Sequence, residues 1–99
     1  MVRRGESARD VHLAVKAILK GHGLDGFFTH GTGHGVGIDI HESPSLGGKS
    51  EDTLQAGDVV TVEPGIYLPG KFGIRIEDIL DVGDKTSVLT SYTRDRVVI

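Results

Sequence analysis

The hydrophobic positions of this chain change their period between its first quarter and the rest. From 11 to 19, apolar residues recur three and four positions apart, which is typical of one face of an α-helix. Ser7 can cap the start of such a helix, and Gly21 and Gly23 can end it. The pattern therefore predicts a helix over residues 8–20. Its predicted buried face consists of Val11, Ala14, Val15, Ile18 and Leu19.

Beyond residue 26, hydrophobic and polar residues alternate with a period of two, as they do in β-strands. The predicted strands cover residues 27–40, 58–63 and 74–80, with shorter ones around 87–90 and 96–99. Pro64-Gly65 and the glycine- and proline-containing stretch 69–73 interrupt this alternation, so we expect an antiparallel pair with irregular ends. Residues 43–57 have the composition of an exposed loop with at most a short element in it.

Length and composition describe one small domain over residues 1–99, of which 37% are hydrophobic. The formal net charge is −3 without a basic cluster, which argues against nucleic acid and anionic membrane as partners. No stretch has the length of a signal peptide or membrane span, so we expect a soluble, cytoplasmic protein. Because there is no cysteine, any metal ion would be held by His, Asp or Glu.

Candidate chemistry begins in residues 30–37, where glycine occupies alternate positions around His30 and His34. Backbone without side chains lets a ligand or an ion approach closely. One extended strand would hold these two histidines roughly 13 Å apart, too far for both to bind one ion. One of them can be a ligand while the other contacts substrate. His41 can join His34 only if the chain turns between them.

Three charged residues stand in otherwise apolar strands. Glu63 must be paired, solvated or bound to an ion, and a strand-end glutamate facing water is the simplest alternative. Glu77 is flanked by isoleucines, which predicts burial, and Arg75 on the same face offers a buried ion pair as the alternative to a metal ligand. One histidine with two glutamates suits Mn²⁺, Fe²⁺, Co²⁺ or Zn²⁺, and carboxylates that bridge ions suggest a two-metal centre.

Four ordered segments, 30–37, 41–44, 61–67 and 73–78, resemble the successive motifs of the pita-bread metallopeptidases. Within this family, the sequences of the motifs are most similar to those of the Xaa-Pro aminopeptidases and Xaa-Pro dipeptidases (prolidases). The match covers roughly residues 6–89. The resemblance implies an α+β fold, the C-terminal half of a pita-bread (creatinase/aminopeptidase-like) architecture. In such a fold an N-terminal helix packs on a curved, mostly antiparallel sheet.

The resemblance also implies two divalent ions, Mn²⁺, Co²⁺ or Zn²⁺, and a peptide substrate with proline in the second position. The implied metal ligands are His34, Glu63 and Glu77. The implied catalytic residues are His30, His41, Glu63 and Arg75. In these roles Glu63 accepts the proton of the attacking water, and Glu77 bridges both ions. His41 contacts the scissile carbonyl, His30 lines the proline-side pocket, and Arg75 orients the ligands.

Such enzymes also use two aspartates that precede the first histidine motif. Only Asp10 and Asp25 precede His30 here, and neither lies in an apolar alternating strand. We therefore expect Met1 to begin a C-terminal half, a partial catalytic domain that is inactive alone. The sheet face that the other half covers would be exposed, which predicts a homo-oligomer or pairing with an N-terminal half-domain.

Two further function classes stay open. Pita-bread domains also serve as non-catalytic interaction modules that have lost their metal, and creatinase-like relatives are metal-free hydrolases of small amidino compounds. The presence of His34, Glu63 and Glu77 together disfavours both classes. The identity of the metal, and the choice between aminopeptidase and dipeptidase, are not determined by the sequence.

Overall fold

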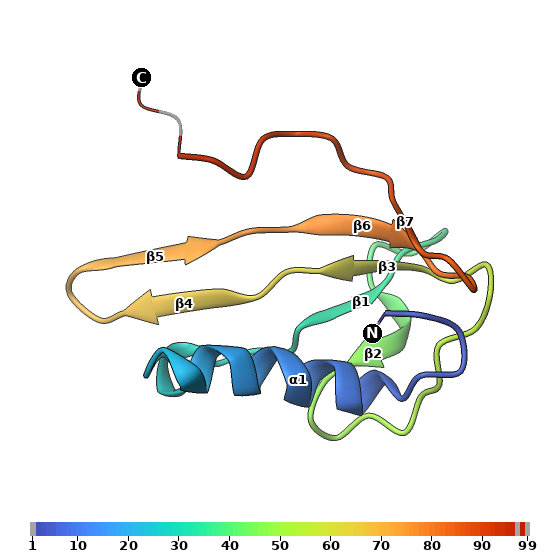
Figure 1. Ribbon diagram of the computed structural model, residues 1–99, viewed down its shortest axis with the longest axis horizontal. Coiled ribbons are helices and arrows are strands. Elements are labelled where there is room, and N and C mark those ends of the chain that lie inside the picture. The colour runs from blue at the N-terminus through green and yellow to red at the C-terminus, as the bar shows by residue number, and fades with distance from the viewer. Residues whose placement is uncertain (1, 97, 99) are drawn as a thin grey trace.

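The computed structural model describes residues 2–96 and 98, which form one long helix lying across an antiparallel sheet (Figure 1). The helical elements are α1, Ala8–Gly21, and the short 3₁₀-helix η1, Asp25–Phe27. The strands are β1, Gly33–Gly35; β2, Glu42–Leu46; β3, Val59–Val62; β4, Gly65–Leu68; β5, Phe72–Arg75; β6, Asp78–Asp81; and β7, Ser87–Val88.

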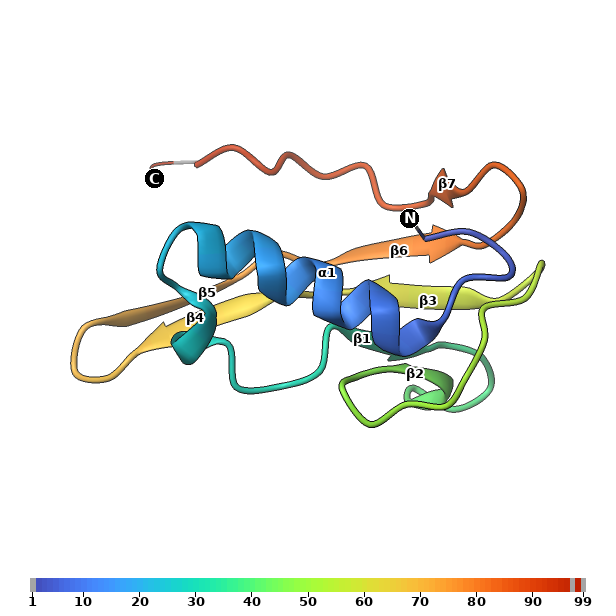
Figure 2. The same ribbon diagram turned by 60° about the horizontal axis from the view of Figure 1, so that its bottom comes forward.

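Five strands form one sheet in the order β2-β1-β3-β6-β7, and each neighbouring pair is antiparallel. β4 and β5 form a separate antiparallel hairpin, which extends from the ends of β3 and β6. Figure 2 shows α1 crossing one face of the strands, while the segment after β7 runs beside β6 away from the helix. The predicted α+β class, with a helix packed on a mostly antiparallel sheet, is confirmed.

The predicted helix is confirmed to within one residue at its end. Ser7 caps α1, since its hydroxyl accepts the N–H of Asp10 at 3.3 Å. The chain leaves the helix through Gly23, whose φ of +70° is a conformation that glycine adopts without strain. The predicted buried face is only partly correct, because Ile18 is 60% exposed whereas His12 is buried.

A small core lies between α1 and the sheet and consists of Ala8, Val11, Leu46, Leu54, Val60 and Val82. Leu46 and Leu54 come from the segment 43–57, whose composition predicts an exposed loop. The prediction is wrong at these two positions because α1 needs apolar partners beneath its first turns, and this segment supplies them.

In the part of the chain that the structure describes, no helix has the length and apolar character needed to cross a membrane.

The long strand predicted over 27–40 is wrong in most of its length. Its start is taken by η1, only Gly33–Gly35 is in the sheet, and the chain then turns so that Gly35 lies opposite Glu42. The turn depends on bare backbone, because a Cβ atom at Gly35 would overlap the carbonyl oxygen of Ser43. The glycine alternation therefore reflects close backbone approaches rather than one extended strand.

The strand pair that follows is confirmed, and its register positions the candidate site. β3 pairs with β6 up to Val62 opposite Asp78, and β4 pairs with β5 from Gly65 opposite Arg75. Between these two ladders Pro64 has no backbone N–H to donate, but its carbonyl oxygen accepts the N–H of Ile76 at 3.3 Å, so the same register continues. Glu63 and Glu77 lie opposite one another in this register, which places two carboxylates side by side.

The C-terminal segment is attached to β6 by side-chain contacts. The hydroxyl of Thr90 donates to the carboxylate of Asp78, and Nε of Arg94 donates to its second oxygen at 2.8 Å. β7 confirms the short strand predicted around 87–90. The strand predicted around 96–99 falls in part on residues 97 and 99, which lie outside the described residues.

Candidate metal centre

His34 lies in the middle of β1, and its ring faces the carboxylate of Glu63, which follows β3. The backbone N–H of His34 donates to Oγ1 of Thr61 at 3.1 Å. Nδ1 of His34 lies 2.9 Å from the carbonyl oxygen of Gly35. Because a carbonyl oxygen can only accept, Nδ1 carries a ring hydrogen. In the neutral form of the ring, Nε2 is then the free electron-pair donor, and it lies 3.7 Å from Oε2 of Glu63.

This pair consists of two electron-pair donors with no hydrogen between them. A separation of 3.7 Å is too long for a direct hydrogen bond. Ligands that each lie about 2.0–2.2 Å from one ion are about 3.4 Å apart in a tetrahedral site and about 4.2 Å apart across the ion. The side chains of His34 and Glu63 are only 18% and 17% exposed, so water screens them weakly. Their geometry and chemistry fit a cation shared by both.

Glu77 adds a second carboxylate next to this pair. Partial burial raises the pKa of Glu77, and a hydrogen bond with Glu63 and the negative charge of Glu63 raise it further. The charge of Arg75, and that of His34 when its ring is protonated, act in the opposite direction. The neighbouring carboxylate of Glu63 therefore makes ionisation of Glu77 less favourable.

The predicted burial of Glu77 is wrong. Its side chain is 39% exposed, and the flanking Ile74 and Ile76 are 51% and 43% exposed. Nη2 of Arg75 lies 3.8 Å from Oε2 of Glu77, so the two residues form a solvent-exposed ion pair, not a buried one. Such a pair adds little to stability.

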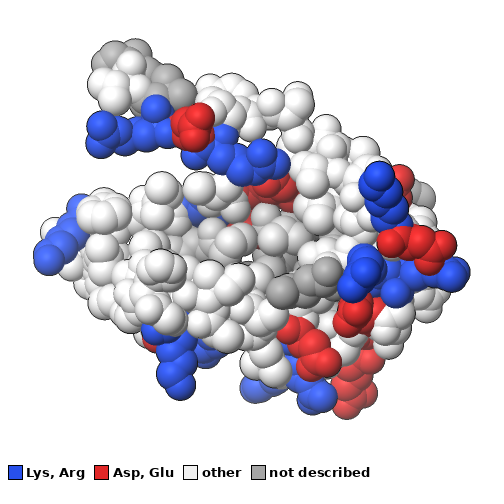
Figure 3. Space-filling model, viewed as in Figure 1, with Lys and Arg blue, Asp and Glu red and all other residues white. Residues whose placement is uncertain are grey.

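Arg75 and Glu77 line a groove of about 490 Å³ between the β5–β6 arm and the C-terminal segment. Figure 3 shows this hollow, with Lys and Arg atoms along the overhanging segment and acidic atoms at its inner end. Arg94 and Arg96 supply positive charge on the outer wall. The groove leaves the side chain of Glu77 accessible from solvent.

His41 joins His34 through the turn that the sequence required. The two ring centroids are 4.3 Å apart, with an angle of 55° between the ring planes. The side chain of His41 is exposed, whereas His34 is half-buried. An exposed imidazole beside a potential ligand can reach a group bound at the His34–Glu63 pair.

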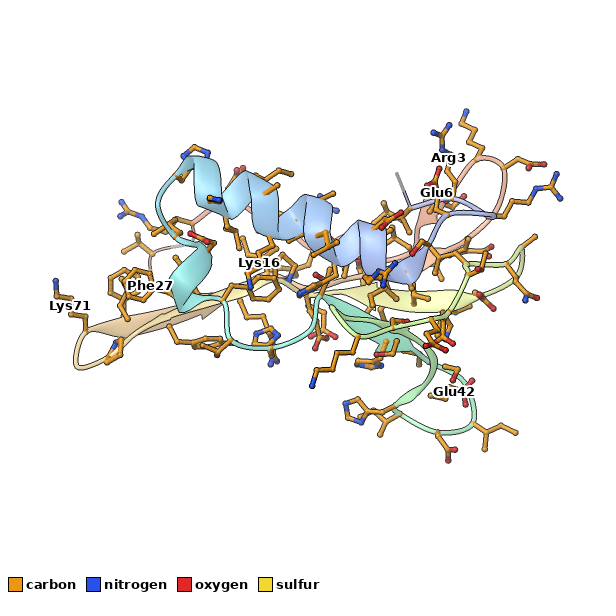
Figure 4. The ribbon with its side chains drawn as sticks, turned by 90° about the horizontal axis from the view of Figure 1, so that it is seen from below. Arg3, Glu6, Lys16, Phe27, Glu42 and Lys71 are labelled. Carbon is orange, nitrogen blue, oxygen red and sulfur yellow. The ribbon has the colours of Figure 1, made fainter. Side chains whose placement is uncertain are left out.

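His30 belongs to a second group of rings. Nδ1 of His30 lies 2.7 Å from the carbonyl oxygen of Gly31 and so carries the hydrogen, while Nε2 accepts the hydroxyl hydrogen of Tyr67 at 2.9 Å. Phe28 packs edge-on against His30 at 5.2 Å. η1 contacts β4, and Figure 4 shows Phe27, the last residue of η1, beside the β4–β5 hairpin. Glu42, at the start of β2, lies well away from this group in the same view. His30 therefore forms an aromatic wall and does not contribute to the His34–Glu63 pair.

In residues 2–96 and 98, no three side chains of His, Asp or Glu converge closely enough to hold a metal ion. The structure brings His34 and Glu63 together as a pair with Glu77 adjoining, and it keeps His30 apart. Asp10 lies in α1 and Asp25 in η1, so neither aspartate belongs to this site. Among the described residues, His34, Glu63 and Glu77 are thus neighbours, but they do not form a complete set of metal ligands.

Two residues that hydrogen-bond to the candidate histidines were not identified from the sequence. Thr61 accepts the N–H of His34, and Tyr67 donates to His30. Thr61 is detectable as the one hydroxyl in a run of valines, because it is 2% exposed and a buried hydroxyl needs a partner. Tyr67 gives no such signal, since its partner is distant in the sequence.

Comparison with known proteins assigns this chain to a family. Residues 1–84 match the profile of metallopeptidase family M24. The putative dipeptidase YkvY of Bacillus subtilis is 41% identical over 91 residues, covering 91% of this chain and 25% of that protein. The structure of an Xaa-Pro dipeptidase from Bacillus anthracis superposes with a TM-score of 0.95 at 36% identity, covering 99% of this chain and 28% of that one.

A second solved structure is the X-prolyl aminopeptidase from Caenorhabditis elegans, described as a cytosolic enzyme with a di-nuclear active site. It matches with a TM-score of 0.69 at 37% identity, covering 80% of this chain and 13% of that one. The chain spans about a quarter of the length of the first two relatives. Its motifs, its fold and its matched residues agree, and the chain therefore belongs to metallopeptidase family M24, with the fold of the C-terminal pita-bread domain of prolidases.

Proposed function

We propose that this chain supplies His34, Glu63 and Glu77 to a dinuclear metal centre that hydrolyses peptides with proline in the second position. The observation that carries the proposal is the 3.7 Å approach of Nε2 of His34 to Oε2 of Glu63, two donors without a hydrogen between them. The adjoining carboxylate of Glu77, with its raised pKa, supports a second, bridged ion. The names of the Bacillus anthracis and Caenorhabditis elegans relatives support the Xaa-Pro substrate.

The donor set limits the metal. One imidazole nitrogen and carboxylate oxygens suit Mn²⁺, Co²⁺ or Zn²⁺. When bound, such ions lower the pKa of a coordinated water toward neutrality and polarise the peptide carbonyl. The chain's own contribution to the first step is Glu63, whose carboxylate accepts the proton of the attacking water. Its weak exposure keeps this carboxylate out of bulk solvent.

The remaining side chains bind and orient the substrate. His41, whose ring lies beside that of His34, donates to the carbonyl oxygen on which negative charge develops. His30 and Tyr67 form the wall of the proline-side pocket, where their rings offer an apolar surface to the pyrrolidine ring. Arg75 holds the outer oxygen of Glu77 and so limits its rotation.

The missing ligands come from a second segment. We propose that an N-terminal half-domain with two aspartates completes the centre and covers the exposed Ile74 and Ile76 beside Glu77. The chain alone then has no peptidase activity. The cytosolic description of the Caenorhabditis elegans relative supports a cytoplasmic location.

Titration calorimetry with Mn²⁺ tests this function. The chain is titrated alone and mixed with the N-terminal half-domain of a family relative that carries both aspartates, and the mixture is assayed on an Xaa-Pro peptide. We expect two ions bound and peptide cleaved only in the mixture. His34→Ala abolishes the tighter site, whereas His22→Ala, at an exposed position, changes nothing.

Each other result has a definite meaning. A mixture that forms a complex but binds no Mn²⁺ would contradict the enzyme function and favour an interaction module. A mixture that hydrolyses an amidino compound without metal would favour a creatinase-like activity. Binding of two ions without loss in His34→Ala would remove His34 from the ligand set.

A further inference from the structure

A buried imidazole of α1 lies against the segment 28–32 and has no role in the chemistry proposed above. His12 is 8% exposed, and its Nδ1 lies 2.9 Å from Oγ1 of Thr32. Burial lowers the pKa of His12, and the charges of Lys16 and His30 lower it further, so the ring is neutral near pH 7. An apolar side chain would fill this position on α1 without any polar group to satisfy.

Thr32, its partner, connects three parts of the structure. It is completely buried, and its backbone N–H donates to the carbonyl oxygen of Leu46 in β2 at 2.8 Å. Its own carbonyl oxygen accepts the backbone N–H of Glu63 at 2.6 Å. The same residue thus receives a side-chain bond from α1 and holds the backbone of the carboxylate that faces His34.

A second path leads from His12 to the aromatic wall. The ring of His12 lies 5.4 Å from that of Phe28, and Phe28 lies 5.2 Å from His30. His30 in turn accepts the hydroxyl of Tyr67. The ring of His12 therefore backs the segment 28–32 at both its ends.

We propose that His12 is a positioning residue for the metal centre, which acts through Thr32 on the backbone of Glu63 and through Phe28 on His30. The inference rests on the proposed function for its consequence, and on the buried hydrogen bonds for its geometry. The segment between His30 and His34 is rich in glycine and has little rigidity of its own. The bond from α1 fixes one orientation of this segment against the helix.

Two matched pairs of variants test the path. Thr32→Val keeps the shape of the side chain and removes the hydroxyl, while Thr32→Ser keeps the hydroxyl. His12→Leu fills the volume without a polar atom, while His12→Asn keeps a polar atom at the position of Nδ1. A purely structural role would affect all four in proportion to their loss of stability.

The first measurement needs no metal. Amide hydrogen exchange of Glu63 in the 99-residue chain is compared with that of Val36, whose N–H donates to Val59 and has no link to His12. We expect Thr32→Val and His12→Leu to speed exchange at Glu63 by about 2- to 10-fold relative to Val36, the range that loss of one hydrogen bond allows. Thr32→Ser and His12→Asn restore protection. Equal changes at both amides would overturn the proposal.

The second measurement uses the mixture with the N-terminal half-domain. Thr32→Val and His12→Leu should weaken Mn²⁺ binding by about 10- to 100-fold, and the conservative variants should recover most of it. Unchanged Mn²⁺ affinity in both would overturn the link to the metal centre. If the unsubstituted mixture binds no Mn²⁺, the proposed function fails, while the exchange experiment still decides whether His12 positions Glu63.

Discussion

Glu63 and Glu77 lie opposite one another where β3 gives way to β4 and β5 to β6, in the register that both ladders share. Pro64 cannot donate to a ladder, but its carbonyl oxygen accepts the N–H of Ile76 at 3.3 Å and keeps that register. Burial raises the pKa of Glu77, and a hydrogen bond with Glu63 and the charge of Glu63 raise it further. The shared register therefore brings two carboxylates together, and in the proposed function a cation neutralises them.

The repulsion between the lone pairs of His34 and Glu63 predicts that Glu63→Gln changes stability in opposite directions without and with metal. Glu63→Gln should stabilise the metal-free chain by roughly 1 kcal/mol, because the amide N–H can donate to Nε2 of His34. It should also remove the stabilisation by Mn²⁺ in the mixture with the half-domain, which for an intact site amounts to about 2.7 kcal/mol at 100 times Kd.

Urea unfolding with and without Mn²⁺ measures both effects of Glu63→Gln. Glu51→Gln, at an exposed glutamate of the loop, serves as the control. A variant that is less stable without metal and is still stabilised by Mn²⁺ would contradict the shared-cation geometry.

The lowered pKa of His12 predicts a loss of stability on acidification. Below its ordinary value of 6.5, the unfolded chain binds a proton at this residue more readily than the folded chain does. The contribution of the neutral ring is therefore complete above 6.5 and is lost as the pH falls through the lower, folded-state pKa. We expect His12→Asn to be less sensitive than the unsubstituted chain to a change from about pH 7.5 to about pH 5.5. Urea unfolding at both values, with His22→Asn as the control, would refute this if all three chains lost equal stability.

The contacts of Asp78 with Thr90 and Arg94 predict that this carboxylate holds the C-terminal segment against β6. The hydrogen bond from Arg94 lowers the pKa of Asp78, and that from Thr90 lowers it further, so their stabilising effect is complete above the ordinary pKa of an aspartate and is lost as the pH falls through the lowered pKa. Asp78→Asn should release the segment and speed its cleavage by a protease at neutral pH. Asp81→Asn, on the same strand, should leave cleavage unchanged. Equal cleavage of the two variants would show that Asp78 does not hold the segment.

The close packing of backbone around Gly33 predicts that adding a side chain there lowers the stability of the chain. A Cβ atom there would overlap the carbonyl oxygen of Thr61, which belongs to the backbone of β3 and cannot rotate away. Gly33→Ala should destabilise the chain by about 1–3 kcal/mol. Gly26→Ala, in η1, meets no atom within 4 Å and serves as the control. Thermal unfolding that ranks Gly26→Ala as the more damaging change would disprove this close approach.

Much of the secondary structure followed from local rules. The period of 3.6 and the Ser7 cap predicted α1 nearly to the residue, and Pro64 predicted the end of β3. Resemblance in four ordered motifs predicted the family and the fold, and both are confirmed. The roles assigned to the site residues stay predictions.

By itself, then, the sequence determined the helix, the main strand pair and the candidate ligands, since these depend on neighbouring residues or on residue type. Only the tertiary structure decided that the chain turns after Gly35, that the ring of His41 lies beside that of His34 and that Glu77 is exposed. It also revealed His12 as a buried partner of Thr32. The physical reason is that alternating glycines are compatible with several backbone paths, and contacts with distant strands and with α1 select one of them.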